Sequence, residues 1–335
     1  MGDWTTIDWD ALDRLRNTFI HRKSPSATPY WTSESDLASY DMTFAERIGW
    51  KWDAVLSHLK TLGWEPSTKY VLDWGCGTAI ASRRVLSTFP HHAWTSLTLW
   101  DHSTLAIQYA QRVLRSDFPN LNIEISSSSI PQNWQNQQGL LLVSHVLNEL
   151  TPSSRSELIQ LARQAQTILW IEPGTYNDSR SLISLREELS EDFTILAPCT
   201  HNATCGLLTE GNERHWCHHF AKPPTEAFTE SYWAKFGKRM DIDLRHLPYS
   251  FLVLERKNDS PSPLTNFSRI IGAPRQYKGF AKILSCQESG VREIELQKRD
   301  NPKLWKELRK GRAGTLHEWE ISNARIIGST SPPPR

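Results

Sequence analysis

The sequence contains no long hydrophobic run. No stretch approaches the roughly 18 consecutive apolar residues that a membrane span requires, so we expect no membrane partner. The first residues, MGDWTTIDWDALDRLRN, have neither the apolar core of a secretory signal nor the acid-poor, Arg-rich composition of an organelle transit peptide, which predicts a cytoplasmic location. With 39% hydrophobic residues among 335, the chain can bury a full core, and nothing in it indicates an oligomer, so we predict a monomer.

Two nucleotide-binding motifs are missing from the segment VLDWGCGTA, at residues 71–79. An apolar strand pattern ends there at Asp73, and Gly75 and Gly77 follow, where backbone N–H groups can approach a ligand closely. There is no third glycine in dinucleotide spacing and no Gly-Lys-Ser/Thr of a phosphate loop, so the segment favours S-adenosylmethionine over NAD or ATP. Asp101 ends the next β-rich run, one helix further along the chain, which is the position of a ribose-binding acid.

Strand and helix patterns alternate through the middle of the chain. The N-terminal part, residues 1–66, has a helical pattern with Ser33 or Ser35 as a cap, and we interpret it as a helical cover. Between 67 and 256, the alternation predicts an α/β fold: a doubly wound, Rossmann-like sheet of the methyltransferase type with helices on both faces. A polar linker then leads to a small, basic, β-rich module at 268–327. The expected strands are 69–73, 95–100, 121–125, 139–144, 167–172 and 247–257, and the expected helices are 79–88, 103–115, 153–166 and 178–189.

The segment SHVLNEL, residues 144–150, follows a strand at its carboxyl end, where open α/β sheets bind ligands. We therefore expect Ser144, Asn148 and Glu149 to line the cofactor pocket. His145 has two interpretations: a base with a pKa near neutrality, or a residue that forms hydrogen bonds at the sheet end. The sequence has no Asn-Pro-Pro-aromatic motif of the kind that positions an amino group, and it assigns no catalytic residue.

The C-terminal module has an unusual charge balance. Residues 269–312 contain 12 Lys or Arg against 5 Asp or Glu, a local net charge of +7 in a chain whose total is +1. In KRDNPKLWKELRKGR, cations surround Trp305 in a pattern compatible with phosphate contacts and base stacking, so RNA is one possible partner. The alternative is an exposed, solvated charged surface. The candidate RNA-binding residues are Lys298, Arg299, Lys306, Arg309 and Lys310.

Four of the five cysteines lie outside the glycine segment: Cys199, Cys205, Cys217 and Cys286. Their spacings, with 5, 11 and 68 residues between neighbours, match no C-x-x-C zinc knuckle. Disulfides are disfavoured in the cytoplasm, so three hypotheses stay open from the residues alone. The cysteines are buried and unpaired, or they hold zinc together with a histidine, or they hold an iron–sulfur cluster through four thiolates. The candidate histidines are His201, His215, His218 and His219.

In combination, these segments resemble a known family. VLDWGCGTA, SHVLNEL, ILWIEPGT at 168–175, APCTHNATC with WCHHF, and a remote cysteine in a basic C-terminal module occur in this order. The arrangement resembles that of the methyltransferase-like assembly factors of the small ribosomal subunit, which have bacterial and mitochondrial members. The resemblance extends from about residue 33 to about residue 320. The chain departs from the family pattern at Thr200 and Gly206, where proline is common, and this departure concerns the geometry of the cysteine loop.

The resemblance implies a methyltransferase-type fold and association with the small ribosomal subunit or its rRNA. It also implies an iron–sulfur cluster, of the 4Fe-4S type, held by Cys199, Cys205, Cys217 and Cys286, with the last joining a Cys-rich insertion at 197–220 to the C-terminal module. Zinc is then the weaker alternative. Three functions stay distinct: an enzyme that methylates rRNA, a ribosome assembly factor that does not catalyse, and a small-molecule methyltransferase with a structural zinc site. Only the third predicts no salt-dependent binding to RNA.

Overall fold

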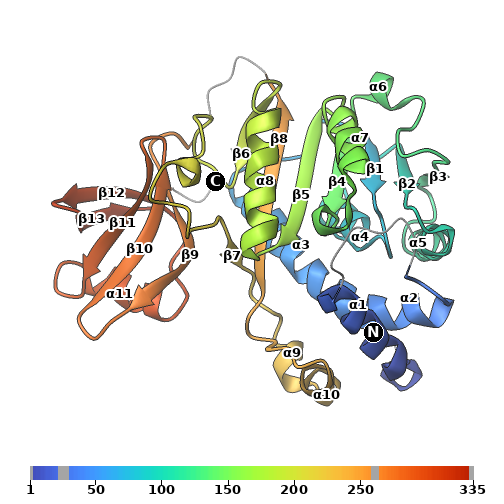
Figure 1. The fold of residues 1–335 in the computed structure, drawn as a ribbon, viewed down its shortest axis with the longest axis horizontal. Helices are drawn as coiled ribbons and strands as arrows, with labels where there is room; N and C mark the ends of the chain where they lie inside the picture. Colours follow the sequence, from blue (N-terminus) through green and yellow to red (C-terminus); the bar gives the residue numbers. More distant parts are fainter. Residues whose placement is uncertain (1–2, 22–29, 258–263, 332–335) are drawn as a thin grey trace. The chain divides into compact units, whose positions relative to one another are not determined.

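The computed structural model describes residues 3–21, 30–257 and 264–331 (Figure 1). None of the helices in this described part of the chain has the length and apolar character needed to cross a membrane. The chain divides into two compact units. The first consists of Met1–Glu172 and Ala221–Leu247, and the second consists of Pro173–Phe220 and Pro248–Arg335. The residues predicted to bind the cofactor belong to the first unit, whereas the four cysteines and the basic module belong to the second.

The N-terminal helices of the first unit follow the prediction. Ser33, and not Ser35, caps the second helix, because its Oγ accepts a hydrogen bond from Asp36 N at 3.1 Å. A π-helical turn, η2, continues α2 into α3 without a break, and such turns are frequent at functional sites. The elements are η1 Trp4–Thr6, α1 Trp9–His21, α2 Glu34–Tyr40, η2 Asp41–Ala45 and α3 Glu46–Thr61.

A later segment packs on these helices through aromatic side chains. It contains α9 (Glu226–Thr229) and α10 (Ser231–Arg239). The ring of Trp233 lies 4.8 Å from that of Trp50, and Tyr232 stacks on Trp4 with the ring centroids 4.2 Å apart. The sequence pattern did not indicate this contact because the partners are far apart along the chain.

Five parallel strands form the sheet of the first unit, in the order β3-β2-β1-β4-β5. Leu140 to Val143 of β4 are fully buried, as expected for a strand covered on both faces. The strand order reverses beside β1, and ligands of such sheets bind at the carboxyl ends of the strands at this point. The predicted doubly wound α/β fold is confirmed. The strands are β1 Tyr70–Trp74, β2 Ser96–Trp100, β3 Asn122–Ile125, β4 Leu140–Ser144 and β5 Thr167–Pro173, and the helices are α4 Ile80–Thr88, α5 Thr104–Asp117, α6 Trp134–Gln137 and α7 Pro152–Ala162.

The second unit begins with α8 (Tyr176–Leu189) and contains the predicted late strand as β8 (Pro248–Arg256). β8 runs antiparallel to two strands that the sequence analysis missed, β6 (Phe193–Ala197) and β7 (His219–Phe220). A loop that carries three cysteines and the short helix η4 (Gly206–Leu208) joins β6 to β7. Most of the predicted polar linker, at 258–263, lies outside the described residues.

The C-terminal module is a closed barrel of five strands in the order β10-β11-β13-β12-β9. One helix, α11, contributes Trp305 and Leu308 to the barrel core, where they join Ile283, Ile294 and Ile326. The predicted β-rich module is therefore confirmed. Its elements are β9 Ser268–Gln276, β10 Phe280–Gln287, β11 Gly290–Gln297, α11 Pro302–Arg309, β12 Leu316–Ser322 and β13 Arg325–Thr330.

Candidate cofactor site and cysteine cluster

The glycine loop leads from the carboxyl end of β1 into α4 and forms hydrogen bonds with the carboxyl end of β2. The backbone N–H groups of Gly75 and Cys76 both donate to the Trp100 carbonyl oxygen, at 2.8 and 3.0 Å. Gly77 N donates to Asp101 Oδ2 at 2.9 Å. The structure therefore brings Gly77 and Asp101, which the sequence pattern assigned to one site, into direct contact.

Both glycines have backbone conformations that other residues rarely adopt. φ is +72° at Gly75 and +51° at Gly77, in the left-handed region that glycine enters at little cost. A Cβ at Gly75 would lie 2.8 Å from Val146 Cγ1, whereas no atom lies within 4 Å of a Cβ position at Gly77. A Cβ position at Gly77, beside the Asp101 carboxylate, thus faces open space.

Asp73 ties the end of β1 to helix α4. Its side chain is buried, and Oδ2 accepts hydrogen bonds from Ser82 Oγ at 2.6 Å and Ser82 N at 3.3 Å. Burial raises the pKa of Asp73 from 3.8 to about 7, against the lowering effect of the Ser82 hydrogen bonds. In this position Asp73 supports the glycine loop.

Replacing this carboxyl, Asp73→Asn, is expected to remove part of the pH dependence of stability. An acid whose pKa is higher in the folded than in the unfolded state makes the folded state lose stability as pH rises between the two pKa values. Between about pH 5 and about pH 7, the wild type should lose about 2 kcal/mol of unfolding free energy relative to the variant. Denaturant unfolding of both proteins measures this difference, and parallel pH profiles would contradict the raised pKa.

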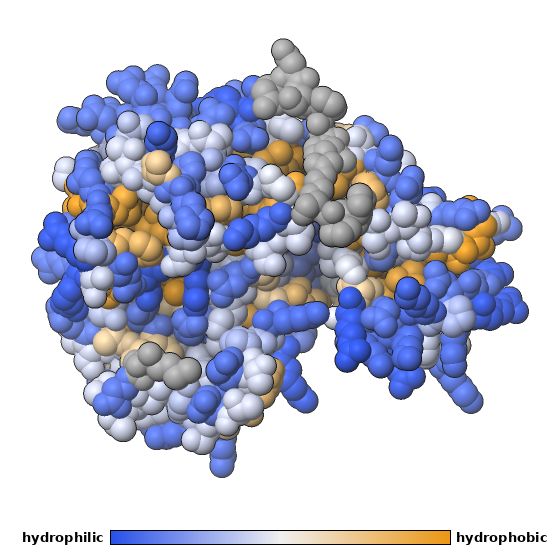
Figure 2. Space-filling view, turned by 180° about the vertical axis from the view of Figure 1, so that it is seen from behind, coloured by the Kyte–Doolittle hydropathy of each residue, from blue (hydrophilic) through white to orange (hydrophobic). Residues whose placement is uncertain are grey.

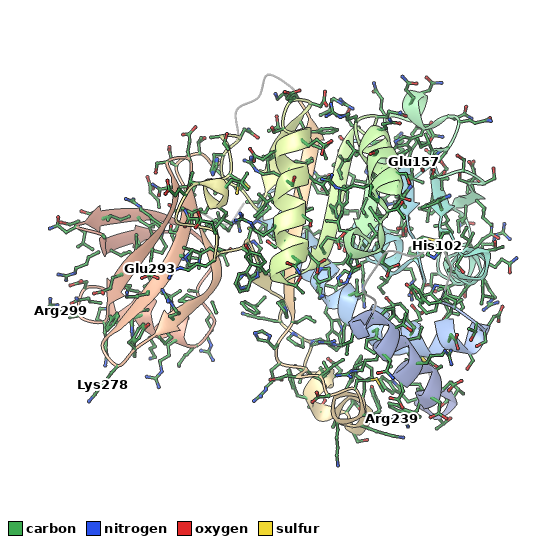
Figure 3. All side chains as sticks on the ribbon, viewed as in Figure 1. His102, Glu157, Arg239, Lys278, Glu293 and Arg299 are labelled. Atoms are coloured by element: carbon green, nitrogen blue, oxygen red, sulfur yellow. The ribbon has the colours of Figure 1, made fainter. Side chains whose placement is uncertain are left out.

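Asp101 follows the end of β2 and holds the other side of the loop. Its Oδ1 accepts a hydrogen bond from Ser103 N at 2.8 Å and lies 3.4 Å from His102 Nδ1. Burial raises the pKa of Asp101, and the neighbouring His102 lowers it. His102 is partly exposed, and Figure 3 labels it. Both carboxylate oxygens of Asp101 thus accept hydrogen bonds from backbone N–H groups, those of Gly77 and Ser103.

The π-helical turn contributes side chains that the sequence analysis missed. Burial raises the pKa of Tyr40, which ends α2, and three nearby carboxylates raise it further. These carboxylates belong to Glu149, Asp41 and Asp101, so the phenol lies close to two of the predicted cofactor-binding residues. Asp41 in turn pairs with Arg83 of α4, which follows the glycine loop. The helical pattern around these residues has no break that would have marked the turn.

The segment after β4 is held by side chains from two other elements. Trp52 Nε1 of α3 donates to Ser144 Oγ at 3.0 Å. Glu172 Oε1 accepts hydrogen bonds from Val146 N at 3.2 Å and Leu147 N at 3.3 Å. Asn148, in the short helix η3 (Leu147–Glu149), is exposed. Ser144 therefore positions this segment, while Asn148 is accessible from solvent.

His145 is held in the neutral form by its surroundings. Burial lowers the pKa of His145 well below 6.5, and the cations of Lys51 and Arg47 lower it further. His145 Nε2 lies 3.3 Å from Lys51 Nζ. A neutral imidazole accepts a hydrogen bond from an ammonium group at this distance, so the contact favours the hydrogen-bonding interpretation over that of a base.

The cysteine loop of the second unit is organised by a buried arginine, Arg186 of α8. Its Nη2 donates to Ala203 O at 2.6 Å and to His201 O at 3.3 Å. The guanidinium also pairs with Glu187 and forms a hydrogen bond with the Cys199 sulfur. Burial lowers the pKa of Arg186, and the nearby Cys199 and Glu187 raise it. The net effect is a pKa above the usual value for arginine. Arg186 therefore stays charged next to the first cysteine.

A second buried arginine, Arg269 of β9, lies near three of the four thiols. Its Nε donates to Pro198 O at 2.8 Å. Burial lowers the pKa of Arg269 to about 10, and thiol charges raise it. These thiols belong to Cys199, Cys217 and Cys286. The two arginines thus place positive charge beside a set of groups that become anionic on deprotonation.

The four predicted ligands lie in one neighbourhood. Burial raises the pKa of Cys217 well above 9, and the other three thiols, Cys199, Cys205 and Cys286, raise it further. Burial also raises the pKa of Cys205 to about 11. Gly206 lets this loop lie directly on β11, since a Cβ there would lie only 2.6 Å from the backbone nitrogen of Val291. At this position, where the resemblance led us to expect proline, glycine therefore has a steric reason.

Two of the four candidate histidines also approach the thiols. Cys217 Sγ lies 3.8 Å from His219 Nε2, and Cys286 Sγ lies 3.8 Å from His201 Nε2. The other two, His215 and His218, contact Arg214 and the Trp216 carbonyl. Among the described residues, no three His, Cys, Asp or Glu side chains are arranged as they would be around a metal ion. The structure gathers the thiols without arranging them as a coordination sphere.

A comparison with protein families shows which family the chain belongs to. Residues 43–318 match the sequence profile of the family described as mitochondrial small ribosomal subunit Rsm22. The chain belongs to the Rsm22 family. This confirms the resemblance to small-subunit assembly factors, and the matched range contains the glycine loop and all four cysteines. No curated protein matches the chain.

Solved structures similar to this Rsm22-family chain include methyltransferases. The magnesium protoporphyrin IX methyltransferase from Synechocystis, with bound SAM, has 12% identity and a TM-score of 0.38, and the match covers 75% of this chain and 98% of that chain. An O-methyltransferase family protein from Burkholderia thailandensis has 15% identity and a TM-score of 0.38, with 75% and 70% covered. At these scores the likenesses carry no argument about function.

The predicted RNA-binding residues of this Rsm22-family chain occupy two places. Lys298 and Arg299 lie in the connection after β11, whereas Lys306 and Arg309 lie on α11 and Lys310 follows it. Lys298 Nζ lies 5.2 Å from the centre of the Trp305 ring. Trp305 itself is only 6% exposed and belongs to the barrel core. The prediction that Trp305 could stack on a base is therefore wrong, because its ring packs inside the protein.

Proposed function

We propose that this Rsm22-family chain binds S-adenosylmethionine at the glycine loop and acts on, or helps to assemble, the small ribosomal subunit through its rRNA. The family match supports the ribosomal part of the proposal. The contact between Gly77 N and Asp101 Oδ2, beside open space, is the observation that supports the cofactor part.

The chemistry of S-adenosylmethionine fits the charges around this loop. The molecule carries sulfonium and ammonium cations, and carboxylates of Asp101 and Glu149 lie near Tyr40. When bound, it supplies an electrophilic methyl group. Asp73 and Ser144 support the surrounding loops through their hydrogen bonds with Ser82 and Trp52. The proposed cofactor site consists of Asp73, Gly75, Gly77, Asp101, Ser144, Asn148 and Glu149.

We also propose that Cys199, Cys205, Cys217 and Cys286 hold an iron–sulfur cluster, with zinc as the alternative. Thiolates are the usual ligands of such clusters, and four of them are near one another here. Four thiolates carry four negative charges, which the buried guanidinium groups of Arg186 and Arg269 offset in part. Because burial raises the pKa of Cys205 and Cys217, cluster binding would release protons and would add to the stability of the second unit.

The compartment is part of the proposal as well. The family description names a mitochondrial ribosomal subunit. We propose instead that this chain meets the small subunit in the cytoplasm. Imaging of the tagged full chain beside compartment markers distinguishes the two.

The experiment that tests the proposed function incubates the purified full chain with isolated ribosomal subunits and radiolabelled S-adenosylmethionine. We expect the chain to sediment with small subunits and not with large subunits, and the binding to weaken with salt. Label in the small-subunit rRNA would identify an enzyme, while sedimentation without label would identify an assembly factor that does not catalyse. Absence of binding to small subunits would contradict the proposal and favour a small-molecule methyltransferase.

A further inference from the structure

The barrel of the second unit has the strand connections of an OB fold. β9 pairs with both β10 and β12, and β11 runs parallel to β13. The helix α11 stands between β11 and β12. In OB folds, the outer face of the second and third strands and the turn between the first and second strands bind oligonucleotides. Here these are β10, β11 and the β9–β10 turn.

The β9–β10 turn carries a pair of stacked aromatic rings, of which Tyr277 is exposed and Phe280 is half-buried. Tyr277 and Phe280 flank the two turn residues, and Tyr277 N donates to Phe280 O at 2.9 Å. Their rings are 4.5 Å apart and nearly parallel, at an angle of 7°. Tyr277 is 43% exposed, in contrast to Trp305 at 6%. An accessible ring that is held flat by a second ring provides a stacking surface for a base.

Three cationic residues lie on or beside this turn. Lys278 is exposed at the tip of the turn. Lys298 N donates to Gly279 O at 2.9 Å, which holds the connection after β11 against the turn and brings Lys298 and Arg299 beside it. The side chain of Arg299 is 73% exposed, and its Nε lies 3.8 Å from Asp300 Oδ1. Figure 3 labels Lys278 and Arg299 at the edge of the barrel, and Figure 2 shows hydrophilic residues at the same lower end of the barrel, seen from behind.

The cations on the strand face itself are already paired. Lys282 Nζ of β10 lies 3.0 Å from Glu293 Oε1 of β11, and Arg275 of β9 pairs with the same carboxylate. At the turn, Arg299 pairs with Asp300, whereas Lys278 and Lys298 form no salt bridge within the described residues. The two lysines next to the aromatic pair thus differ from Lys282 and Arg275 on the strand face, which share one carboxylate.

We infer that the barrel binds single-stranded RNA at this turn, with a base stacked on Tyr277 and phosphates contacted by Lys278, Lys298 and Arg299. The inference rests on the proposed function in taking RNA as the partner. The inferred site differs from the basic surface of α11, where Lys306, Arg309 and Lys310 lie. The RNA must be unpaired, because a duplex keeps its bases stacked inside.

The test measures binding of the full chain to a fluorescent oligouridine and to an RNA hairpin duplex by anisotropy. We expect the oligouridine to bind more tightly, Tyr277→Ala to weaken its binding about ten-fold or more, and Tyr277→Phe to restore it. Lys278→Glu should weaken binding and lower the salt dependence by about one counterion or more, whereas Lys303→Glu on α11 should change both little. Phe228→Ala, an exposed aromatic of the first unit, is the matched control for ring loss.

Each alternative result has a separate meaning. If the wild type binds neither RNA, the proposed RNA partner fails, and the inference fails with it. If the wild type binds RNA but Tyr277→Ala and Lys278→Glu leave the affinity unchanged, only the assignment to this turn is overturned. Equal affinity for the hairpin duplex and the oligouridine overturns the preference for unpaired RNA. Lys278 is exposed, so its substitution reports on binding even if Tyr277→Ala impairs folding.

Discussion

Replacing Cys217 with serine is expected to remove bound iron and sulfide from the anaerobically purified protein and to lower its melting temperature by at least about 5 °C. Serine lacks the thiolate that an iron–sulfur cluster requires. The charges of the other three thiols act on Cys217, so its loss removes one of four neighbouring thiols. The measurement combines an optical spectrum, iron, sulfide and zinc analysis, and thermal unfolding.

Cys76→Ser is the matched control for this experiment. Cys76 is buried and Cys217 is half-buried, but Cys76 lies in the glycine loop of the first unit and outside the cysteine set. We expect this variant to keep the full iron and sulfide content. Zinc in place of iron in the wild type would support the alternative ligand, while a wild type that binds no metal would show that the cysteines are structural thiols.

Replacing Asp101 with asparagine is expected to weaken S-adenosylmethionine binding by roughly 10- to 100-fold, the effect of losing one charge-assisted hydrogen bond. The substitution removes the negative charge and leaves one oxygen where the carboxylate uses two, toward Gly77 and Ser103. Gly77→Ala should also weaken binding, because its methyl group would occupy the open space beside the loop. Isothermal titration of the folded variants with S-adenosylmethionine measures both effects.

Glu124→Gln provides the control for charge loss in the same unit. Glu124 lies on β3, is exposed, and contacts Asn122. Its substitution should leave the dissociation constant unchanged. An unchanged dissociation constant in Asp101→Asn, with a normal melting temperature, would refute the proposed role of this acid.

The sheet could be predicted from the sequence because its strands are buried runs that end in recognisable turns. Leu140 to Val143 are apolar without interruption, and Gly75 and Gly77 mark the turn after β1. β6 was missed because it is a short strand at a sheet edge whose buried residues alternate with half-buried ones. β7 has only two residues, too few for any pattern.

The candidate site could be predicted only where its residues follow one another along the chain. Asp73, Gly75 and Gly77 form one segment, and Asp101 follows at the spacing of one strand and helix. Tyr40 and Arg83 join the site through packing of distant helices, for which the sequence carries no marker. The basic segment showed that cations gather in the barrel, but only the fold shows that Trp305 faces the core and Tyr277 faces solvent.

The measurement that tests the central claim most directly is ultraviolet crosslinking of the full chain to RNA in its native cells, followed by sequencing of the captured RNA. The account predicts strong enrichment of small-subunit rRNA over large-subunit rRNA, reduced in Tyr277→Ala and retained in Phe228→Ala. Equal recovery of both rRNAs, or recovery of neither, would contradict the claim that this chain acts at the small ribosomal subunit.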